Sequence, residues 1–249
     1  MNLITIVRSI KPELQKKKYA LMDANEIMID SELTQDKVQL WSSWDNLESD
    51  NYLKDGARFR QRRFGLFNWQ PKSGELQSLP PAPYFQSAET NNYAGGINRQ
   101  FAHLTEETRA NRFLHELIKF TFRQFPLSGE MLNSSWEIDV HQFRIVSSEE
   151  EQGEPTPEGI HRDDDEFNAI FLIRRDNVSG GVNTVYDNQK NPLTSLTLLQ
   201  PMDSVLVWDP HVMHGVTPIY PTNPSKQGVR DVLVIGYNYS PKLKQPASQ

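Results

Sequence analysis

Two short stretches decide what this chain is expected to be: Gly159-Ile160-His161-Arg162-Asp163 and, later in the chain, His214-Gly215-Val216-Thr217-Pro218-Ile219. In an extended segment, residues i and i+2 point to the same side. His161 and Asp163 can therefore both face inward while Arg162 faces away. One strand cannot wrap around an ion, so a third ligand has to come from another strand, and His214 meets that need. We expect a metal site made of these three side chains.

Two imidazoles and one carboxylate are the ligand set of the facial triad in non-haem Fe(II) oxygenases, which leaves coordination positions open for a co-substrate and O₂. A His-x-Asp triplet also occurs in surface turns, so the motif needs support from its surroundings. His211 follows Pro210 and is expected to be exposed or to support the site rather than to bind the metal. His103 and His141 have no carboxylate at this spacing, and we expect His141 to be a hydrogen-bonded core residue.

The composition is that of a soluble globule with a core, since 37% of the 249 residues are apolar and 23% are charged. The absence of cysteine excludes a disulfide scaffold, an iron–sulfur cluster and a thiolate zinc site, and it fits a cytoplasmic protein. The N-terminus lacks the apolar core of a secretory signal, and no window approaches the length of a membrane span. A net charge of −6 argues against a nucleic-acid partner. We expect a small-molecule partner, and the oligomeric state stays open.

The N-terminal half is expected to be helical and loop-rich. Residues 11–48 are loosely periodic and predict helix. Residues 70–99 form a long irregular stretch, whose aromatic side chains are candidates either for pocket walls or for the core. Residues 105–124 predict a clear helix, with Thr105 as its N-cap. His115 lies off the apolar face of this helix and is expected to be exposed to solvent.

The stretch 55–64 begins with the turn Asp55-Gly56, and the rest of it is expected to be an arginine-rich strand. It contains Arg58, Arg60, Arg62 and Arg63. These side chains either form a solvated, salt-bridged face, or one or two of them turn inward to bind a substrate carboxylate.

From residue 136 onward the pattern changes to strands. The alternation in residues 136–145 changes phase at His141, which predicts either a bulge or a strand buried on both faces. An acidic loop follows at 147–158. Regularly spaced short strands are typical of a sandwich or barrel. We expect them at about 167–174, 182–187, 194–199, 204–208, 215–220 and 229–240.

Arg230 enters the last of these strands, Arg230-Asp231-Val232-Leu233-Val234-Ile235-Gly236-Tyr237, which is apolar at nearly every position. Such a strand is expected to be central, with both faces covered. A guanidinium there is costly unless it is paired. Its partner is either Asp231 or another acid at the surface, or the carboxylate of a bound dicarboxylate, which the guanidinium fork matches.

Several segments carry a family resemblance. They are Lys54-Asp55-Gly56-Ala57-Arg58-Phe59-Arg60, Val140-His141-Gln142-Phe143-Arg144-Ile145, Glu158-Gly159-Ile160-His161-Arg162-Asp163, Asn177-Val178-Ser179-Gly180-Gly181, the His214–Ile219 stretch and Arg230–Ile235. Together they resemble the bacterial Fe(II)/2-oxoglutarate-dependent amino-acid hydroxylases, in the group that includes L-isoleucine 4-hydroxylase. The resemblance covers most of residues 50–240.

This resemblance implies a mainly β fold with flanking helices, built on a double-stranded β-helix (a cupin-like jelly roll). It implies one domain over residues 1–249, in which a helical and loop-rich part at 1–130 packs on a core at 131–240 that contains the metal site. It further implies that His161, Asp163 and His214 bind Fe(II) and that Arg230 binds the distal carboxylate of 2-oxoglutarate. O₂ would be the other co-substrate, and ascorbate is expected to support activity.

The expected function is therefore a 2-oxoglutarate-dependent dioxygenase that hydroxylates the side chain of a free aliphatic or methionine-like L-amino acid. The alternatives are a peptide or protein side-chain hydroxylase and a non-catalytic jelly-roll binding protein. Asp163 is followed by Asp164 and Asp165, where a glycine or another small residue is expected. Their charges either favour a cationic group or face solvent. Candidates for binding a substrate ammonium are Asp164, Asp165, Glu166 and Asp231, and candidates for its carboxylate lie between Arg58 and Arg63.

Overall fold

The computed structural model describes residues 2–239 and is built on one large antiparallel sheet. Its strands lie in the order β2, β12, β8, β15, β7, β5 and β4, and β6 pairs with β5. Residue 240, at the end of the strand expected over 229–240, lies outside the described residues. The strands are β2 (Tyr19–Met22), β4 (Glu48–Ser49), β5 (Arg60–Gln70), β6 (Glu75–Ser78), β7 (Trp136–Ser147), β8 (Phe167–Asp176), β12 (Ser204–Val207) and β15 (Gly228–Tyr239).

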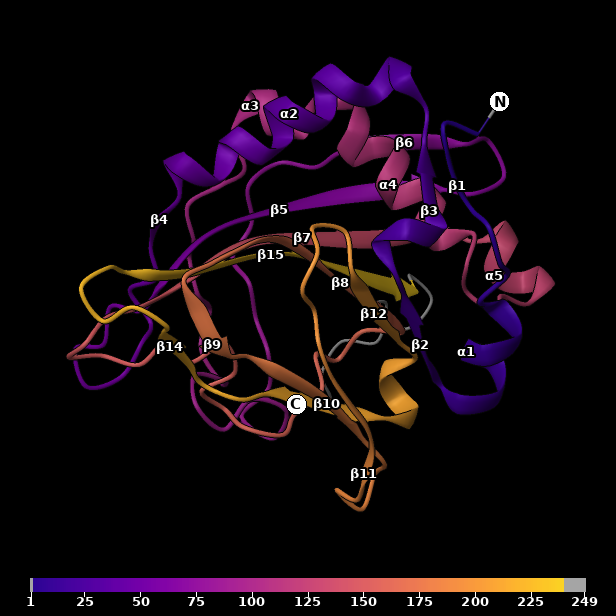
Figure 1. Cartoon of the computed structure of the whole chain (residues 1–249). Coiled ribbons are helices and arrows are strands. Elements are labelled where there is room, and N and C mark those ends of the chain that lie inside the picture. Colours follow the sequence, from indigo (N-terminus) through magenta and orange to yellow (C-terminus); the bar gives the residue numbers. More distant parts are fainter. Residues whose placement is uncertain (1, 240–249) are drawn as a thin grey trace.

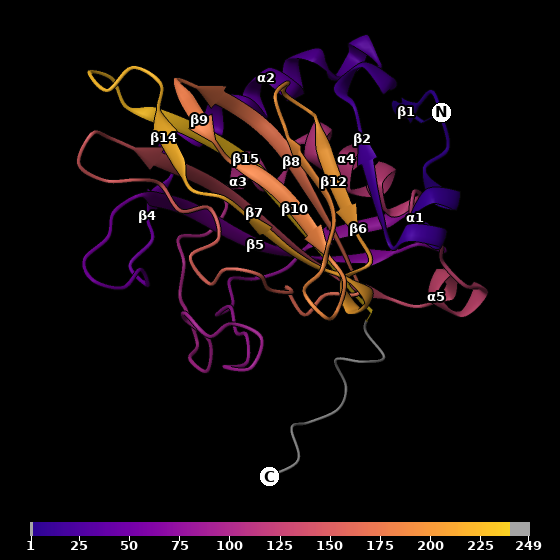
Figure 2. The same cartoon turned by 60° about the horizontal axis from the view of Figure 1, so that its bottom comes forward.

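Smaller antiparallel pieces lie against one face of the main sheet. One contains β11 (Pro192–Thr197), β10 (Val182–Tyr186) and β13 (Met213–Val216), and another contains β14 (Ile219–Pro221) and β9 (Val178–Gly180). Figure 2 shows β10 in front of the long strands of the main sheet. Two facing antiparallel sheets, with an apolar cluster that includes Ile170, Val185 and Val232 between them, make this the mainly β architecture that the sequence predicts.

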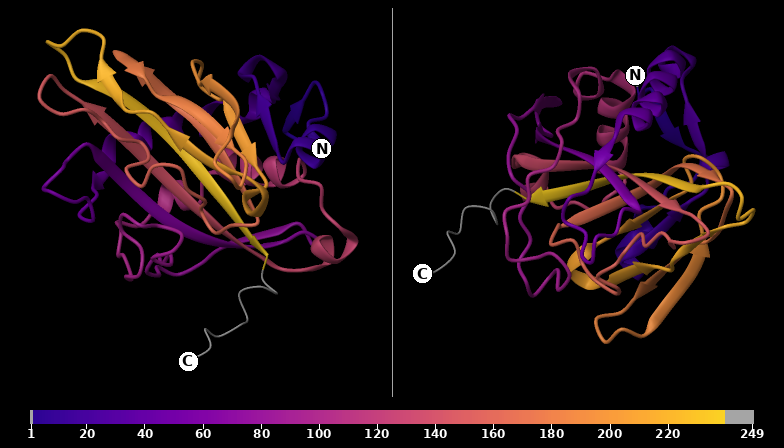
Figure 3. Two further views of the ribbon diagram at one scale, coloured as in Figure 1. Left: turned by 90° about the horizontal axis from the view of Figure 1, so that it is seen from below. Right: turned by 90° about the vertical axis from the view of Figure 1, so that its left-hand side faces the viewer.

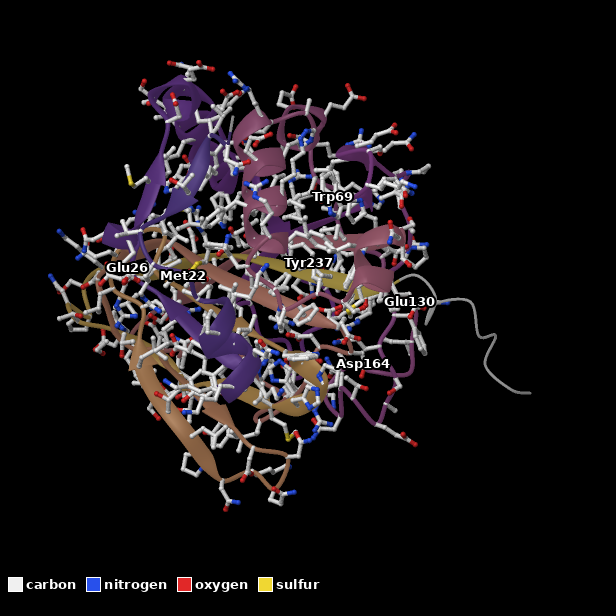
Figure 4. All side chains as sticks on the ribbon, turned by 90° about the vertical axis from the view of Figure 1, so that its right-hand side faces the viewer. Met22, Glu26, Trp69, Glu130, Asp164 and Tyr237 are labelled. Carbon is white, nitrogen blue, oxygen red and sulfur yellow. The ribbon has the colours of Figure 1, made fainter. Side chains whose placement is uncertain are left out.

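Helices form a third layer on the other face of the main sheet, as Figure 1 and the right-hand view of Figure 3 show. The largest apolar cluster fills the space between this layer and the sheet. In Figure 4, Trp69 and Tyr237 lie towards the helices, whereas Asp164 lies on the other side of the main sheet. The α-helices are α1 (Lys11–Lys17), α2 (Thr34–Ser42), α3 (Glu106–Arg109), α4 (Arg112–Phe122) and α5 (Gly129–Asn133). The short 3₁₀ helices are η1 (Ala24–Glu26), η2 (Ser31–Leu33), η3 (Ser43–Asn46) and η4 (Asp209–His211). A separate pair of short strands is formed by β1 (Ile4–Ile6) and β3 (Ile27–Ile29).

Alternation along β15 explains its continuous apolar sequence. Val232 and Val234 face the pocket between the sheets, whereas Leu233 and Ile235 belong to the core beneath the helices. β15 lies between β8 and β7, so it is the central strand expected from its composition. The register of β7 with both neighbours continues through His141 without a shift. The change of phase there therefore reflects burial on both faces and not a bulge.

The prediction of helix over residues 11–48 is wrong in part. α1 ends at Lys18, which adopts a left-handed conformation (φ 71°), and the next four residues form strand β2. β2 pairs with β12 at the edge of the main sheet, and Tyr19, Ala20 and Met22 are buried there. A partner strand far away in the sequence overrides the local helical pattern.

The helix expected over 105–124 is two helices. Thr105 caps α3 as predicted, and the Asn111 side chain then accepts a hydrogen bond from the Leu114 N–H and starts α4. The prediction that His115 is solvent-exposed is wrong. Its Nε2 lies 2.6 Å from the Arg109 carbonyl oxygen, its ring packs edge-on to Phe67, and burial lowers its pKa.

Three smaller boundaries also differ from expectation. β5 begins at Arg60 rather than directly after the turn Asp55-Gly56, and β6 interrupts the stretch expected to be irregular over 70–99. The strand expected over 215–220 is split between β13 and β14, which pair with different strands, so that His214 lies within β13. Within residues 2–239, none of the helices combines the length and the apolar character needed to cross a membrane.

Candidate active site

His161, Asp163 and His214 come together at one end of the pocket between the two sheets. His161 Nε2 lies 3.4 Å from Asp163 Oδ1, and His214 Nε2 lies 3.4 Å from Asp163 Oδ2. One potential ligand atom from each of the three residues lies within 4.8 Å of the other two. Arg162 turns away and donates to Asn188 Oδ1, as the i, i+2 alternation predicts. The donor set and its spacing thus fit a facial triad with open positions.

Hydrogen bonds orient the ligands. His161 Nδ1 lies 2.9 Å from the Gly159 carbonyl oxygen, which can only accept, so Nδ1 carries the proton and Nε2 is left for a metal. Asn168 Nδ2 donates to Asp163 Oδ2 over 2.5 Å. The backbone N–H groups of Asp163 and Asp164 both donate to the buried carboxylate of Asp209, at 3.1–3.2 Å. Asp209 begins η4, just before β13, so the segment that leads to His214 also positions Asp163.

Charges within the cluster shift the pKa values of its members. Burial alone would lower the pKa of His161, but the carboxylates of Glu158 and Asp163 outweigh burial and raise this pKa to about 10. Burial and the neighbouring His161 lower the pKa of His214 to about 4. Burial alone would raise the pKa of Asp163, but the two histidines hold it well below its usual range. A divalent cation would displace the proton of His161, because a metal binds neutral imidazole.

Arg230 lines the same pocket and is 2% exposed. Its one hydrogen bond in the described structure is a long one, 3.5 Å from Nη2 to Asn183 Oδ1, and its Nε has no partner. Burial and the nearby charge of Arg175 lower its pKa to about 10. Gly181 has a positive φ of 68°, and a Cβ there would lie 3.0 Å from Arg175 Nη1. The absence of a side chain at this position therefore leaves room for the Arg175 guanidinium.

The interpretation that Arg230 is a surface residue paired with Asp231 is therefore wrong. Asp231 faces the opposite side of β15 and accepts two hydrogen bonds of 2.8 Å from Arg144. No ion pair of Arg230 occurs within residues 2–239. A buried guanidinium without an acid is strongly unfavourable, so Arg230 fits the carboxylate of a bound ligand.

The arginine-rich strand does not present a uniformly solvated face. Arg60 and Arg62 are buried and line the pocket, whereas Arg58 is exposed and Arg63 contacts Glu48 and backbone carbonyls outside it. Arg60 and Arg62 share one carboxylate, that of Asp50. The inward-facing alternative is thus the one that the fold adopts.

Of the four acidic candidates for a cation site, only Asp165 lines the pocket. Glu166 accepts a hydrogen bond from Trp208 Nε1, and Asp231 faces the helices. Asp164 has a positive φ of 70°, which explains why a glycine is expected at this position, since Asp is among the few other residues that tolerate it. The Asp164 carboxylate accepts a hydrogen bond from Thr90 Oγ1 outside the pocket.

Sequence reasoning missed three groups at this site: Asp139, Arg99 and Asp209. Asp139 could have been found, because it shares with His141 the inward face of β7 and both are polar in a buried strand. His141 is hydrogen-bonded as expected, but it also lines the pocket. Arg99 and Asp209 come from irregular segments, in which no periodicity indicates direction. His211 is exposed and is not part of the three-residue cluster.

Comparisons with known proteins agree with this geometry. A family model described as 2OG-Fe dioxygenase matches residues 41–236. The L-isoleucine-4-hydroxylase of Bacillus thuringiensis is 26% identical over 224 residues, which cover 87% of this chain and 89% of that relative. The 3(1)-hydroxy-L-isoleucine 4-dioxygenase of Pantoea ananatis is 26% identical over 203 residues, which cover 80% of this chain and 79% of that protein.

Among solved structures, a bsmA homolog from Methylobium petroleophilum PM1 matches with a TM-score of 0.77 and 28% identity, covering 92% of this chain and 91% of its own. The structure of IDO from Bacillus thuringiensis matches with a TM-score of 0.74 and 18% identity, covering 92% and 93% of the two chains. These likenesses identify the two facing sheets as the jelly roll that the resemblance implies. The chain belongs to the 2OG-Fe dioxygenase family and is an enzyme that uses Fe(II), 2-oxoglutarate and O₂.

Proposed function

We propose that this enzyme hydroxylates the side chain of a free aliphatic or methionine-like L-amino acid. In this proposal His161, Asp163 and His214 bind Fe(II), and Arg230 binds the distal carboxylate of 2-oxoglutarate. The observation that carries it is the position of Arg230, a buried guanidinium without an acid in the pocket that contains the three ligands. A dicarboxylate that reaches from the metal to Arg230 supplies the missing charge.

Bound Fe(II) would supply the reaction of O₂, in which one oxygen atom enters the succinate formed with CO₂ from 2-oxoglutarate and the other enters the C–H bond that becomes hydroxylated. The chain's own residues orient the proposed ligands and exclude water from the pocket. Asn168 and Asp209 hold Asp163, and the Gly159 carbonyl oxygen fixes the ring of His161. Apolar side chains of the main sheet, among them Ile170, Val232 and Val234, line the pocket and suit an aliphatic substrate.

A covered pocket favours a small substrate over a peptide. The segment 84–99 covers the loop that contains Asp163 and Asp164, and two hydrogen bonds connect the segment to this loop. Gln86 Nε2 donates to the Asp163 carbonyl oxygen over 3.3 Å, and Thr90 donates to Asp164. Tyr84, Gln86, Asn91, Tyr93 and Arg99 of this segment line the pocket. The names of the two relatives, both of which refer to isoleucine, support an amino-acid substrate.

The test is succinate release with Fe(II), 2-oxoglutarate and ascorbate against a panel of free L-amino acids that includes isoleucine, leucine and methionine. We expect coupled succinate release with at least one of them, and little with its N-acetyl and amide derivatives. Blocking either end leaves a buried charge of the enzyme unpaired, which such sites reject strongly. Peptides turned over as fast as free amino acids would instead support a peptide or protein hydroxylase. A chain that binds no 2-oxoglutarate would support a non-catalytic binding protein.

A further inference from the structure

The pocket contains a second buried guanidinium, that of Arg99, which forms no ion pair within the described residues. It is 2% exposed and lines the pocket together with the proposed iron ligands. Its one hydrogen bond in the described structure goes to a neutral group, from Nη2 to Gln86 Oε1 over 2.6 Å, and its Nε has no partner. The guanidinium also lies 4.9 Å from the centre of the Tyr84 ring. In the proposed function Arg230 binds the distal carboxylate of 2-oxoglutarate, so Arg99 is available for a carboxylate of a second ligand.

Positive charge is in excess around Arg99. Arg60 and Arg62 line the same pocket, and the described carboxylate that pairs with them is that of Asp50, 2.8 Å from Arg60 Nε and 3.6 Å from Arg62 Nη1. Arg62 is 3% exposed, and its Nε also has no hydrogen-bond partner in the part of the chain that the structure describes. Glu158 lines the pocket too, but it lies 3.4 Å from His161 Nε2. Three buried guanidinium groups line one pocket, and Asp50 pairs with two of them, so together they form an anion site.

Two acidic side chains, Asp139 and Asp165, lie together nearby. Both are buried in the pocket wall, and neither forms an ion pair with a lysine or arginine in the described part of the chain. Their carboxylates converge over Gly236 of β15, where an added Cβ would lie 2.4 Å from Oδ2 of each. Any other residue at position 236 would therefore collide with both carboxylates.

Neutral amides complete this acidic corner. Asn238 Nδ2 donates to Asp139 over 2.9 Å, and Asn168 Nδ2 donates to Asp165 over 3.2 Å. Oδ1 of Asn168, a fully buried residue that lines the pocket, accepts no hydrogen bond within residues 2–239. Two adjacent carboxylates and a free carbonyl oxygen are a set of acceptors that a cation with several N–H donors would satisfy.

His141 connects the two charged corners. Arg62 Nη2 lies 2.6 Å from His141 Nδ1, and because arginine can only donate, Nδ1 accepts. The ring proton is then on Nε2, which lies 3.2 Å from Asp139 Oδ1. The anion site and the cation site are thus separated by one imidazole ring. That separation suits opposite charges carried by a single small molecule, such as the two groups on one α-carbon.

We propose that Arg99, together with Arg62, binds the α-carboxylate of the substrate, and that Asp139 and Asp165 bind its α-ammonium. This assignment rests on the proposed function and deepens it, because it makes a free α-amino acid the required substrate class. A residue inside a peptide has neither a free α-carboxylate nor a free α-ammonium group. It would therefore leave the arginines and the aspartates of the pocket without their ligand partners. The apolar wall of the main sheet then surrounds the side chain.

Binding can test this assignment separately from turnover. Protein loaded with Mn(II) and 2-oxoglutarate is titrated in a calorimeter with L-isoleucine, L-leucine and L-methionine. The same titration is made with the amine that lacks the carboxylate and with the acid that lacks the amino group. We expect Arg99→Leu to weaken binding of the amino acid and of the des-amino acid roughly tenfold to hundredfold, the loss expected for one charge-assisted hydrogen bond. The same substitution leaves binding of the amine unchanged.

Asp139→Asn should show the opposite pattern, with weaker binding of the amino acid and of the amine and unchanged binding of the des-amino acid. Arg99→Lys keeps the charge but not the fork, and should fall between wild type and Arg99→Leu. Arg174→Leu is the matched control, because Arg174 forms an exposed ion pair with Asp176 outside the pocket. Unchanged affinity for 2-oxoglutarate in each variant reports that the fold and the metal site are intact.

One outcome overturns the assignment alone: a wild-type protein that binds 2-oxoglutarate and an amino acid, while Arg99→Leu and Arg99→Lys bind that amino acid equally tightly. A wild-type protein that binds 2-oxoglutarate and none of the amino acids overturns both the assignment and the proposed amino-acid substrate. A wild-type protein that binds Mn(II) but no 2-oxoglutarate contradicts the proposed function itself.

Discussion

His161 and His214 exchange two backbone hydrogen bonds, from His161 N to the His214 carbonyl oxygen at 3.0 Å and from His214 N to the His161 carbonyl oxygen at 2.9 Å. They form an isolated antiparallel bridge between the segment before β8 and strand β13, and their ring centres lie 4.4 Å apart. The main chain therefore places both imidazoles beside Asp163. Holding ligands on rigid backbone positions lowers the entropic cost of binding a metal.

The first prediction concerns the metal. His161→Ala, Asp163→Ala and His214→Ala should each lose tight Mn(II) binding, measured by electron paramagnetic resonance of free Mn(II), and should lose succinate release. The far-UV circular dichroism spectrum should stay unchanged, because the backbone bridge does not need the side chains. His211→Ala is the control and should retain both properties. Loss of succinate release in His211→Ala, together with retained succinate release in His214→Ala, would refute the ligand assignment.

The second prediction concerns 2-oxoglutarate. Arg230→Leu should raise the KM for 2-oxoglutarate roughly tenfold to hundredfold, the effect of losing one charge-assisted hydrogen bond, and should change the KM of the amino acid far less. Without 2-oxoglutarate the variant should be no less stable than wild type, because a buried guanidinium without an acid destabilises the fold. Added 2-oxoglutarate should raise the Tm of wild type but not of the variant. An unchanged KM would exclude Arg230 and move the carboxylate site to another arginine that lines the pocket, Arg60, Arg62 or Arg99.

The third prediction concerns Asp209, which does not belong to the ligand set. Asp209→Ala removes the acceptor for the Asp163 and Asp164 N–H groups. Metal affinity should fall roughly tenfold to hundredfold, as is typical when a group that supports a ligand is lost. Equilibrium dialysis with Mn(II) measures this, and Asp209→Asn should recover part of the affinity because it keeps one acceptor oxygen. Wild-type affinity in Asp209→Ala would exclude the positioning role.

The fourth prediction concerns pH. Burial alone would raise the pKa of Asp50, but Arg60 and Arg62 outweigh burial and lower this pKa below its usual range. A group with a lowered folded-state pKa stabilises the fold above its unfolded pKa, and this stability is lost as the pH falls through the folded value. Asp50→Asn should cost about 3–5 kcal/mol of unfolding free energy at pH 7, as for a broken buried ion pair.

Below about pH 4, the unfolded-state pKa of aspartate, the difference between Asp50→Asn and wild type should shrink. Urea unfolding from pH 7 down to pH 3 measures it. Asp45→Asn is the control, because the Asp45 side chain is 72% exposed in its contact with Arg144, and it should change stability little at any pH. A constant difference over this range would show that Asp50 is not held ionised by its arginines.

Local sequence was sufficient where a short-range rule applies. The i, i+2 spacing predicts that His161 and Asp163 share a side, and the continuous apolar sequence of β15 predicts a strand covered on both faces. Both features follow from strand geometry alone. The same reasoning failed at β2, whose sequence fits a helix until β12 pairs with it, and at His115, whose exposure depends on Phe67 and on the end of α3.

The sequence by itself determined the candidate ligand set, the central position of β15 and, through its resemblance, the family. Only the tertiary structure decided which charges have partners. Arg144 and Arg230 look alike in the sequence, yet one meets Asp231 and the other meets no acid within the described residues. Arg99 and Asp139 likewise face one pocket from a loop and a strand that are distant in the chain. Electrostatic pairing depends on distance in space, which the order of residues along a chain does not specify.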